Sequence, residues 1–260
     1  MGENALAGSI SVSGIKRVLI LGGTTEASLL VRRLADDHRN LDVILSFAGR
    51  TVAPQYASKQ VRIGGFGGAE GLASYLRHEL IDIMIDATHP FAARMRWNAA
   101  AACSDAGIPR LRLERGPWQQ HAGDIWHIVP DIDQASAALA WSQRIFLTIG
   151  RQELAAFEGY ANKWFLVRAI EPPDLDPSLP GELLLARGPF SIEGELDLLT
   201  TRRIDTIVSK NSGGNATEAK LIAARHLGIK VVMVERPPNP PGPLVRSVAA
   251  TLDWLGQFVS

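Results

Sequence analysis

The stretch Arg17-Val18-Leu19-Ile20-Leu21-Gly22-Gly23-Thr24-Thr25-Glu26-Ala27 decides the fold. Its consecutive aliphatic residues predict a strand that is buried on both faces of a sheet. Two glycines follow at once, and then a helical pattern begins that places Leu29, Leu30 and Leu34 on one side. A strand, a tight turn and a helix in this order are the first part of an α/β fold.

The turn after this strand suits a phosphate group. Glycine takes positive φ freely and lets a ligand approach the backbone. The start of the helix offers unpaired N–H groups and the positive end of the helix dipole. The register Gly22-x-Thr24-x-x-Ala27 is a relaxed form of the dinucleotide fingerprint, so Gly22, Gly23, Thr24 and Thr25 are candidate cofactor ligands. An ordinary turn with a capping threonine accounts for the same residues, and the motif alone does not decide between the two.

Composition excludes several classes of protein. The 260 residues include 27 basic and 27 acidic side chains, so no overall charge favours nucleic acid or a membrane surface. The single cysteine, Cys103, excludes an intrachain disulfide or a cysteine-based metal cluster and fits a reducing cytoplasm. No apolar run approaches the ~18 residues of a membrane-spanning helix. We expect a cytoplasmic protein, and we interpret residues 1–14 as a flexible leader that lacks the basic start of a signal peptide.

Strands and helices alternate along the whole chain, which indicates parallel sheets. The first half ends at a change of composition, Arg115-Gly116-Pro117-Trp118, and the second half repeats the alternation more loosely. We therefore predict two Rossmann-like, doubly wound parallel-sheet domains with a cleft between them. The predicted division is a leader over 1–14, a cofactor domain over 15–115 and a substrate-side domain over 116–260.

The end of the second predicted strand favours NADP over NAD. In dinucleotide-binding folds an acidic residue here suits a free ribose 2′-hydroxyl, whereas an arginine suits a 2′-phosphate. This chain has no acid at that position and carries Ser46, Arg50 and Thr51 instead. An arginine offers a phosphate two charge-assisted donors. A solvated surface arginine is the alternative reading of Arg50.

Another buried strand over 81–87 ends in Thr88-His89-Pro90. Ligands of open α/β sheets collect beyond the carboxyl ends of the strands, so Thr88 and His89 are candidate site residues. A structural role for this histidine is the alternative. Asp86, His89 and Lys210 are the candidate general acids, and no spacing singles out one of them.

A second set of polar residues follows the strand predicted over 204–208 and reads Lys210-Asn211-Ser212-Gly213-Gly214. A lysine, two side-chain hydrogen-bonding groups and paired glycines can bind an anion. Arg151 and Arg168 are expected at comparable strand ends, so three cations could line one wall of a cleft, although each could be a solvated terminal charge. The chain has no Walker A loop, no Tyr-x-x-x-Lys pair and no Gly-x-Ser-x-Gly elbow, and no metal site is expected.

Taken together, these pieces resemble the precorrin-6A reductase family, including its cobalt-precorrin-6A variant, of corrin-ring (vitamin B12) biosynthesis. The resemblance runs from Val18 to Val234. It is carried by Leu19–Ala27, Ser46–Arg50, Asp86–Ala92, Gly150-Arg151 with Leu154 and Phe157, Arg187–Ser191 and Ser209–Gly214.

The resemblance implies an NADPH-dependent reductase that delivers hydride to one double bond of a polycarboxylated tetrapyrrole, turning precorrin-6A into its dihydro form, precorrin-6B. Gly22–Thr25 would then bind the pyrophosphate, and Thr88 and His89 would lie near the nicotinamide. The substrate's carboxylates would bind Arg151, Arg168 and the Lys210–Gly214 stretch, and the product could be handed to the next enzyme of the pathway.

Two other functions use the same loops. One is an NADP-dependent reductase of a different bulky polyanion, and the other is a dinucleotide-sensing protein without chemistry. The cations of the second domain favour an enzyme, because a sensor does not need them. The proton donor stays unassigned at this stage.

Overall fold

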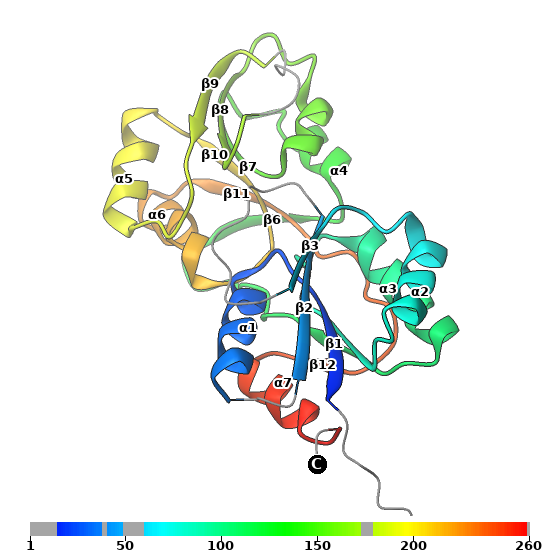
Figure 1. The fold of residues 1–260 in the computed structure, drawn as a ribbon. Helices are drawn as coiled ribbons and strands as arrows, with labels where there is room; N and C mark the ends of the chain where they lie inside the picture. The colour runs from blue at the N-terminus through cyan, green and yellow to red at the C-terminus, as the bar shows by residue number, and fades with distance from the viewer. Residues whose placement is uncertain (1–14, 38–40, 49–59, 173–178, 259–260) are drawn as a thin grey trace, which may run out of the picture. The chain divides into compact units, whose positions relative to one another are not determined.

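A computed structural model describes residues 15–37, 41–48, 60–172 and 179–258. In this part of the chain the strands form two six-stranded sheets (Figure 1). Each sheet is the centre of a compact unit. The first unit comprises Met1–Thr88, Arg94–Glu114 and Pro240–Ser260, and the second comprises His89–Ala93 and Arg115–Asn239.

The first sheet has the strand order of dinucleotide-binding folds. In spatial order its strands are β12 (Leu244–Val245), β5 (Arg110–Leu113), β4 (Ile83–Asp86), β1 (Lys16–Leu21), β2 (Leu41–Phe47) and β3 (Gln60–Ile63). All neighbouring pairs are parallel. The order reverses between β1 and β4, and such a switch point is where open α/β sheets bind ligands beyond the strand ends.

Helices cover both faces of the first sheet, as the apolar sequence of β1 predicts. Val18 and Ile20 face the core shared with α1 (Thr25–Asp37) and α7 (Val248–Leu255). Leu19 and Leu21 face the opposite core, beneath α2 (Gly68–His78) and α3 (Ala93–Ala106). Successive side chains of a strand point to opposite faces, so a strand buried on both sides reads as an unbroken apolar run.

The second sheet is also wholly parallel. In spatial order its strands are β6 (Ile125–Val129), β11 (Lys230–Val234), β10 (Thr206–Lys210), β7 (Arg144–Thr148), β8 (Trp164–Ala169) and β9 (Gly181–Leu185). One face is covered by α4 (Ile132–Ala137) and the 3₁₀ helix η1 (Arg151–Phe157), and the other by α5 (Ile192–Thr201) and α6 (Ala219–Leu227). A short 3₁₀ helix, η2 (Asn215–Thr217), precedes α6.

In each sheet one edge strand departs from the chain order of a doubly wound fold, in which the sixth strand directly follows the fifth. In the second sheet it is β6, which precedes the other five strands in the chain. In the first sheet it is β12, which follows the whole second unit. This differs from the predicted division, because residues 240–260 belong to the first unit and not to a domain over 116–260. The two-residue strand β12 follows a proline-rich segment and has too few residues to show a periodic pattern.

No helix in the described residues is both long enough and apolar enough to cross a lipid bilayer.

Candidate active site

The turn between β1 and α1 requires both of its glycines. Gly22 donates its N–H to the Ser46 carbonyl at 2.8 Å. A Cβ on Gly22 would lie 2.9 Å from Leu45 Cδ1 and 3.0 Å from Phe47 Cε1. Gly23 has a φ of +112°, and within the described residues no atom beyond its chain neighbours lies within 4 Å of the position that its Cβ would take. Gly22 is therefore needed for packing, whereas Gly23 borders open space at the carboxyl end of β1.

Thr24 caps α1 and joins it to β4. The Thr24 hydroxyl accepts a hydrogen bond from Ala27 N at 3.2 Å and donates to the Ala87 carbonyl at 2.8 Å. The capping role that the sequence left open is thus confirmed for Thr24. Thr25 is exposed at the first position of the 13-residue helix, where backbone N–H groups and the helix dipole favour an anion.

Asp86, the last residue of β4, is an anchor for Thr88. The Asp86 side chain is fully buried, and its Oδ1 accepts hydrogen bonds from Thr88 N at 3.1 Å and from Thr88 Oγ1 at 2.7 Å. Its Oδ2 accepts from Arg112 Nη1 at 2.7 Å. Three donors thus converge on this carboxylate, an arrangement that suits a positioning group better than the proton donor for which Asp86 was a candidate.

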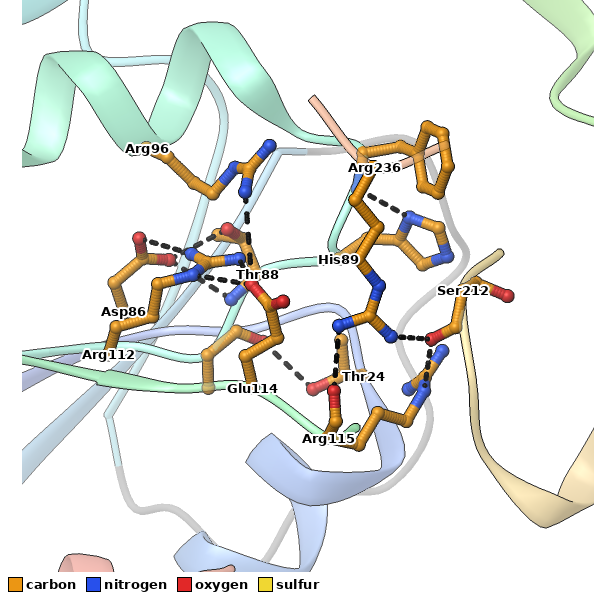
Figure 2. Close-up of polar contacts among 12 residues, drawn as sticks. Thr24, Asp86, Thr88, His89, Arg96, Arg112, Glu114, Arg115, Ser212 and Arg236 are labelled. Carbon is orange, nitrogen blue, oxygen red and sulfur yellow. Dashed lines mark hydrogen bonds and ion pairs between the residues drawn. The ribbon is translucent and has the colours of Figure 1, made fainter. Parts of the chain in front are cut away.

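Asp86 belongs to a buried network of two acids and two arginines (Figure 2). Arg112 donates its Nε to Glu114 Oε2 at 2.7 Å, and Arg96 Nη1 lies 3.8 Å from the same oxygen. All four side chains are at most 2% exposed. Two positive and two negative groups balance, as buried charges must.

His89 begins the short segment that belongs to the second unit. Its Nδ1 accepts a hydrogen bond from Phe91 N at 3.2 Å, and its carbonyl accepts from Ala92 N at 2.8 Å. An accepting Nδ1 places the proton of the neutral ring on Nε2. Thr88, in contrast, is assigned to the first unit, so the chain passes from the first unit to the second between these two neighbouring candidates.

The structure brings Lys210 and Arg151 to adjacent strand ends. β10 ends at Lys210, β7 lies beside it, and Arg151 opens η1 just after β7. Glu153, which the sequence did not single out, forms an ion pair with Lys210 and accepts a hydrogen bond from Gly150 N at 3.0 Å. Arg151 pairs with Glu171 at 3.5 Å. Both predicted substrate ligands therefore have a carboxylate partner within their own unit.

The loop after Lys210 is shaped by Asn211 and the two glycines. Asn211 accepts a hydrogen bond from Trp118 N at 2.8 Å and donates to the Trp118 carbonyl at 3.2 Å. Gly213 and Gly214 have φ of +66° and +88°, and a Cβ on Gly213 would lie 1.9 Å from the Gly116 carbonyl oxygen. The side chain of Asn211 thus fastens the loop to Trp118.

Arg168 is the penultimate residue of β8, one residue before the strand end where the sequence placed it. It lies within β8, and its Nη1 pairs with Glu195 Oε1 of α5 at 2.7 Å. The guanidinium lies over the rings of Phe146 and Phe190, and the side chain is only 9% exposed. Because residues alternate between the two faces of a strand, Arg168 points toward the α5 side while Val167 joins the opposite core. This placement argues against the predicted role of Arg168 in substrate binding.

Of the three predicted 2′-phosphate ligands, Ser46 lies within the described residues. Ser46 is 4% exposed, and its carbonyl accepts the hydrogen bond from Gly22. Arg50 and Thr51 lie outside the described residues.

The sequence analysis missed several residues that hold these loops. They are Glu114, Arg112, Arg115, Trp118, Glu153 and Arg236. A signal was present for two of them, because Arg115 follows β5 and Arg236 follows β11 within two residues. The rule that drew attention to Thr88 and Lys210, a polar residue just beyond a buried strand, would have found both.

Two parallel sheets, a glycine turn at the switch point of the first and cations at the strand ends of the second define a two-unit α/β protein of Rossmann type. The sequence model of the family described as "Precorrin-6x reductase CbiJ/CobK" matches residues 17–256, and the chain belongs to that family. The resemblance stated from the sequence motifs is thereby confirmed.

Individual relatives agree with this assignment. The chain is 48% identical to a protein of Rhodococcus erythropolis named precorrin-6A reductase, over 92% of this chain and 97% of the relative. It is 27% identical to the cobalt-precorrin-6A reductase of Salmonella typhimurium, over 85% and 87% of the two chains. A solved structure titled CobK precorrin-6A reductase superposes with a TM-score of 0.87 at 44% identity, over 94% of this chain and 97% of that one.

Proposed function

We propose that this protein reduces one double bond of precorrin-6A to give the dihydro product precorrin-6B, with NADPH as hydride donor, in the synthesis of the corrin ring. Family membership supports the reaction. The observation that carries the cofactor assignment is the Gly22–Thr25 turn, which opens α1 at the switch point of the first sheet. The higher identity to a precorrin-6A reductase, 48% against 27%, favours the cobalt-free substrate.

The residues of the first unit fit a dinucleotide. Among the described residues nothing fills the space beside Gly23, and backbone N–H groups at the start of α1 would bind the pyrophosphate. Arg50 and Thr51, which follow β2 and Ser46 in the sequence, would bind the 2′-phosphate. Thr88, held by Asp86, would contact the nicotinamide, and so would the next residue, His89, which is assigned to the second unit. When bound, NADPH would supply the hydride.

The second unit would bind the substrate. Lys210 and Arg151 stand at adjacent strand ends and offer charge-assisted hydrogen bonds to carboxylates. Lys210 is paired with Glu153, and Arg151 is paired with Glu171. A substrate carboxylate would therefore share each cation with a protein carboxylate.

One proton must accompany the hydride for the double bond to become saturated. Three donors around its carboxylate tie Asp86 to Thr88 and Arg112, which argues against Asp86. His89 Nε2, Lys210 Nζ and a water molecule are the remaining candidates. We propose that the protein contributes mainly by orienting the nicotinamide against the tetrapyrrole. The cofactor supplies the hydride, and the conjugated macrocycle can delocalise the charge that the hydride brings.

The test uses the purified full chain. NADPH and NADH are titrated separately, and nicotinamide absorbance is then followed after addition of precorrin-6A. We expect tighter binding of NADPH than of NADH, and oxidation of NADPH only when the tetrapyrrole is present. With NADPH that carries deuterium at both C4 positions of the nicotinamide, the product should gain one deuterium by mass spectrometry.

The controls separate the alternatives. Cobalt-precorrin-6A added in place of precorrin-6A should be turned over more slowly. Binding of NADPH without oxidation by either tetrapyrrole would contradict the proposal and favour a sensor. A product without deuterium would contradict direct hydride transfer.

A further inference from the structure

Arg236 binds the main chain of the loop that follows Lys210. Its Nε donates to the Asn211 carbonyl at 2.7 Å, and its Nη2 donates to the Ser212 carbonyl at 3.0 Å. The same guanidinium also donates to the carbonyls of Arg115, at 2.8 Å, and Gly116, at 3.0 Å. Figure 2 shows Arg236 directed at Ser212 and Arg115. One side chain thus joins two separate stretches of backbone.

Arg115 contacts the same loop. Its Nε donates to the carbonyls of Ser212 and Gly213, both at 2.8 Å. Three consecutive carbonyls, those of Asn211, Ser212 and Gly213, therefore accept from arginine side chains. The carbonyl oxygens of residues 211–213 therefore all point toward positively charged guanidinium groups.

The N–H side of the loop faces the other way. In a trans peptide group the N–H points in the opposite direction to the C=O that precedes it in the same group. The N–H groups of Gly213 and Gly214 therefore point away from the guanidinium groups that bind the Ser212 and Gly213 carbonyls. Neither N–H has an acceptor within the described residues. Successive N–H groups of this kind form a concave site for an anion.

The loop has little freedom to adopt another shape. Both glycines have positive φ, and a Cβ on Gly214 would lie 2.9 Å from Arg115 Cδ. Trp118 adds a hydrogen bond from its Nε1 to the Gly214 carbonyl at 3.2 Å. The loop is thus held against the segment of residues 115–118 along its whole length.

We propose that Arg236 is a positioning residue, which holds the loop so that the Gly213 and Gly214 N–H groups are presented, next to Lys210, to a carboxylate of the substrate. The proposal deepens the proposed function and rests on it for the polycarboxylate substrate. Lysine cannot replace Arg236, because an ammonium has three donors and lacks the planar fork that serves several carbonyls at fixed angles. Without Arg236 the loop keeps its contacts to Arg115 and Trp118 but loses the guanidinium that ties the Asn211 and Ser212 carbonyls to those of Arg115 and Gly116, so the direction of its N–H groups is no longer fixed.

The kinetic test compares Arg236→Ala and Arg236→Lys with Arg225→Ala. Arg225 is a matched control, because it is a partly buried arginine of the same unit, on α6, and it pairs with Asp124 at 2.8 Å. We expect both Arg236 variants to raise KM for precorrin-6A by about tenfold to a hundredfold, since misplaced binding groups cost this much. The Kd of NADPH should stay within about twofold, because the proposed cofactor residues other than His89 belong to the other unit.

Chemical rescue separates positioning from folding. Added ethylguanidinium should lower the KM of Arg236→Ala and leave that of Arg225→Ala unchanged, whereas methylammonium should rescue neither. An unchanged KM in Arg236→Ala would overturn the proposal, as would an equal rise in Arg225→Ala or an equal weakening of NADPH binding.

A binding measurement keeps this proposal distinct from the proposed function. Uroporphyrin, a polycarboxylated macrocycle, is titrated into the wild-type chain and into Arg236→Ala while backbone amide resonances are recorded. We expect the Gly213 and Gly214 resonances to shift in the wild type and to shift much less in the variant. If these shifts occur but precorrin-6A is not reduced, the proposed function fails and the positioning role stands. If these two resonances do not respond in the wild type, the positioning role fails.

Discussion

Arg112 of β5 and Asp86 of β4 are direct neighbours in the first sheet and form a buried ion pair, with Nη1 and Oδ2 2.7 Å apart. The other oxygen of Asp86 binds the backbone and the hydroxyl of Thr88. Thr88 is a proposed nicotinamide contact. Its position therefore depends on the buried carboxylate of Asp86, two residues earlier in the chain, and on the Arg112 charge that pairs with it.

Arg112→Met should lower the free energy of unfolding by about 3–5 kcal/mol, because it leaves the Asp86 and Glu114 carboxylates buried without their main partner. Chemical denaturation would measure this loss. The double variant Asp86→Asn with Arg112→Met should recover part of the loss, since it removes one of the orphaned charges. Lys16→Met breaks the surface pair with Asp82 and should change stability little. A loss in Arg112→Met no larger than in Lys16→Met would contradict the role of the network.

Gly23→Ala should weaken NADPH binding strongly, because it adds a side chain beside the proposed pyrophosphate site and strains a residue at φ +112°. Gly107→Ala is the matched control, since Gly107 also has positive φ, +68°, with nothing near its Cβ position, and it follows α3. Each variant should lose about 1–2 kcal/mol of stability from backbone strain. Only Gly23→Ala should lose cofactor affinity in a fluorescence titration, and similar affinities in the two variants would count against the site.

Arg50→Ala should weaken NADPH binding by roughly 1.5–3 kcal/mol, the effect of losing a charged hydrogen bond. NADH lacks the 2′-phosphate, so its affinity should hardly change. Parallel titrations of the two cofactors measure the difference. Equal losses for NADPH and NADH would rule out Arg50 as the 2′-phosphate ligand.

Substitutions of Lys210 and Glu153 should change the KM for the tetrapyrrole in opposite directions. Lys210→Met should raise KM for the tetrapyrrole about tenfold through loss of a charged hydrogen bond. Glu153→Gln should lower KM, because it removes the carboxylate that competes for Lys210 and keeps an oxygen for the Gly150 N–H. Lys230→Met is the control and should leave KM unchanged. Lys230 begins β11, whereas Lys210 lies beside Val234 at the other end of that strand. A rise in KM for Glu153→Gln would show that Glu153 orients Lys210 and does not compete with the substrate.

Stability should depend on pH through Lys220. Burial lowers the pKa of Lys220 to about 7 against an ordinary 10.5, with nearby Glu195 opposing the shift and Arg168 adding to it. Between these two values the unfolded chain binds one more proton than the folded chain. The free energy of unfolding should therefore rise with pH in this window, by at most about 1.4 kcal/mol per pH unit.

Lys220→Met should remove this contribution. Urea denaturation of both proteins between about pH 7 and pH 9 would measure it, as a steeper rise in the wild type. The comparison with the variant cancels other groups, such as the Cys103 thiol, whose pKa burial raises to about 12. Equal slopes in the two proteins would contradict the titration of Lys220.

Much of the first unit could be predicted from the sequence, because its central strands are buried on both faces and read as unbroken apolar runs. The glycine turn at Gly22 and Gly23 and the capping threonine Thr24 are short-range features, so their geometry follows from neighbouring residues. Lys210 and Arg151 were also placed correctly at strand ends, since parallel strands all end at the same edge of a sheet.

What the sequence did not show depends on contacts between distant residues. The direction of Arg168 follows from its place in the alternation of β8 and from Glu195 on a separate helix. Similarly, Asn211 looked like a ligand until the structure showed that Trp118 occupies its side chain. The pairing of β12 with β5 joins residues more than a hundred positions apart and has no local signature.

The late position of β12 and α7 in the chain bears on how the protein is made. Translation delivers residues 240–258 after every residue of the second unit, yet β12 and α7 complete the first unit, and Leu255 is fully buried in its core. The second unit can therefore finish folding on the ribosome while the first still exposes the β5 edge and one side of α1. The unit that contains β1 to β5 is the last to be completed, and a fragment that stops near residue 115 would expose that apolar surface permanently.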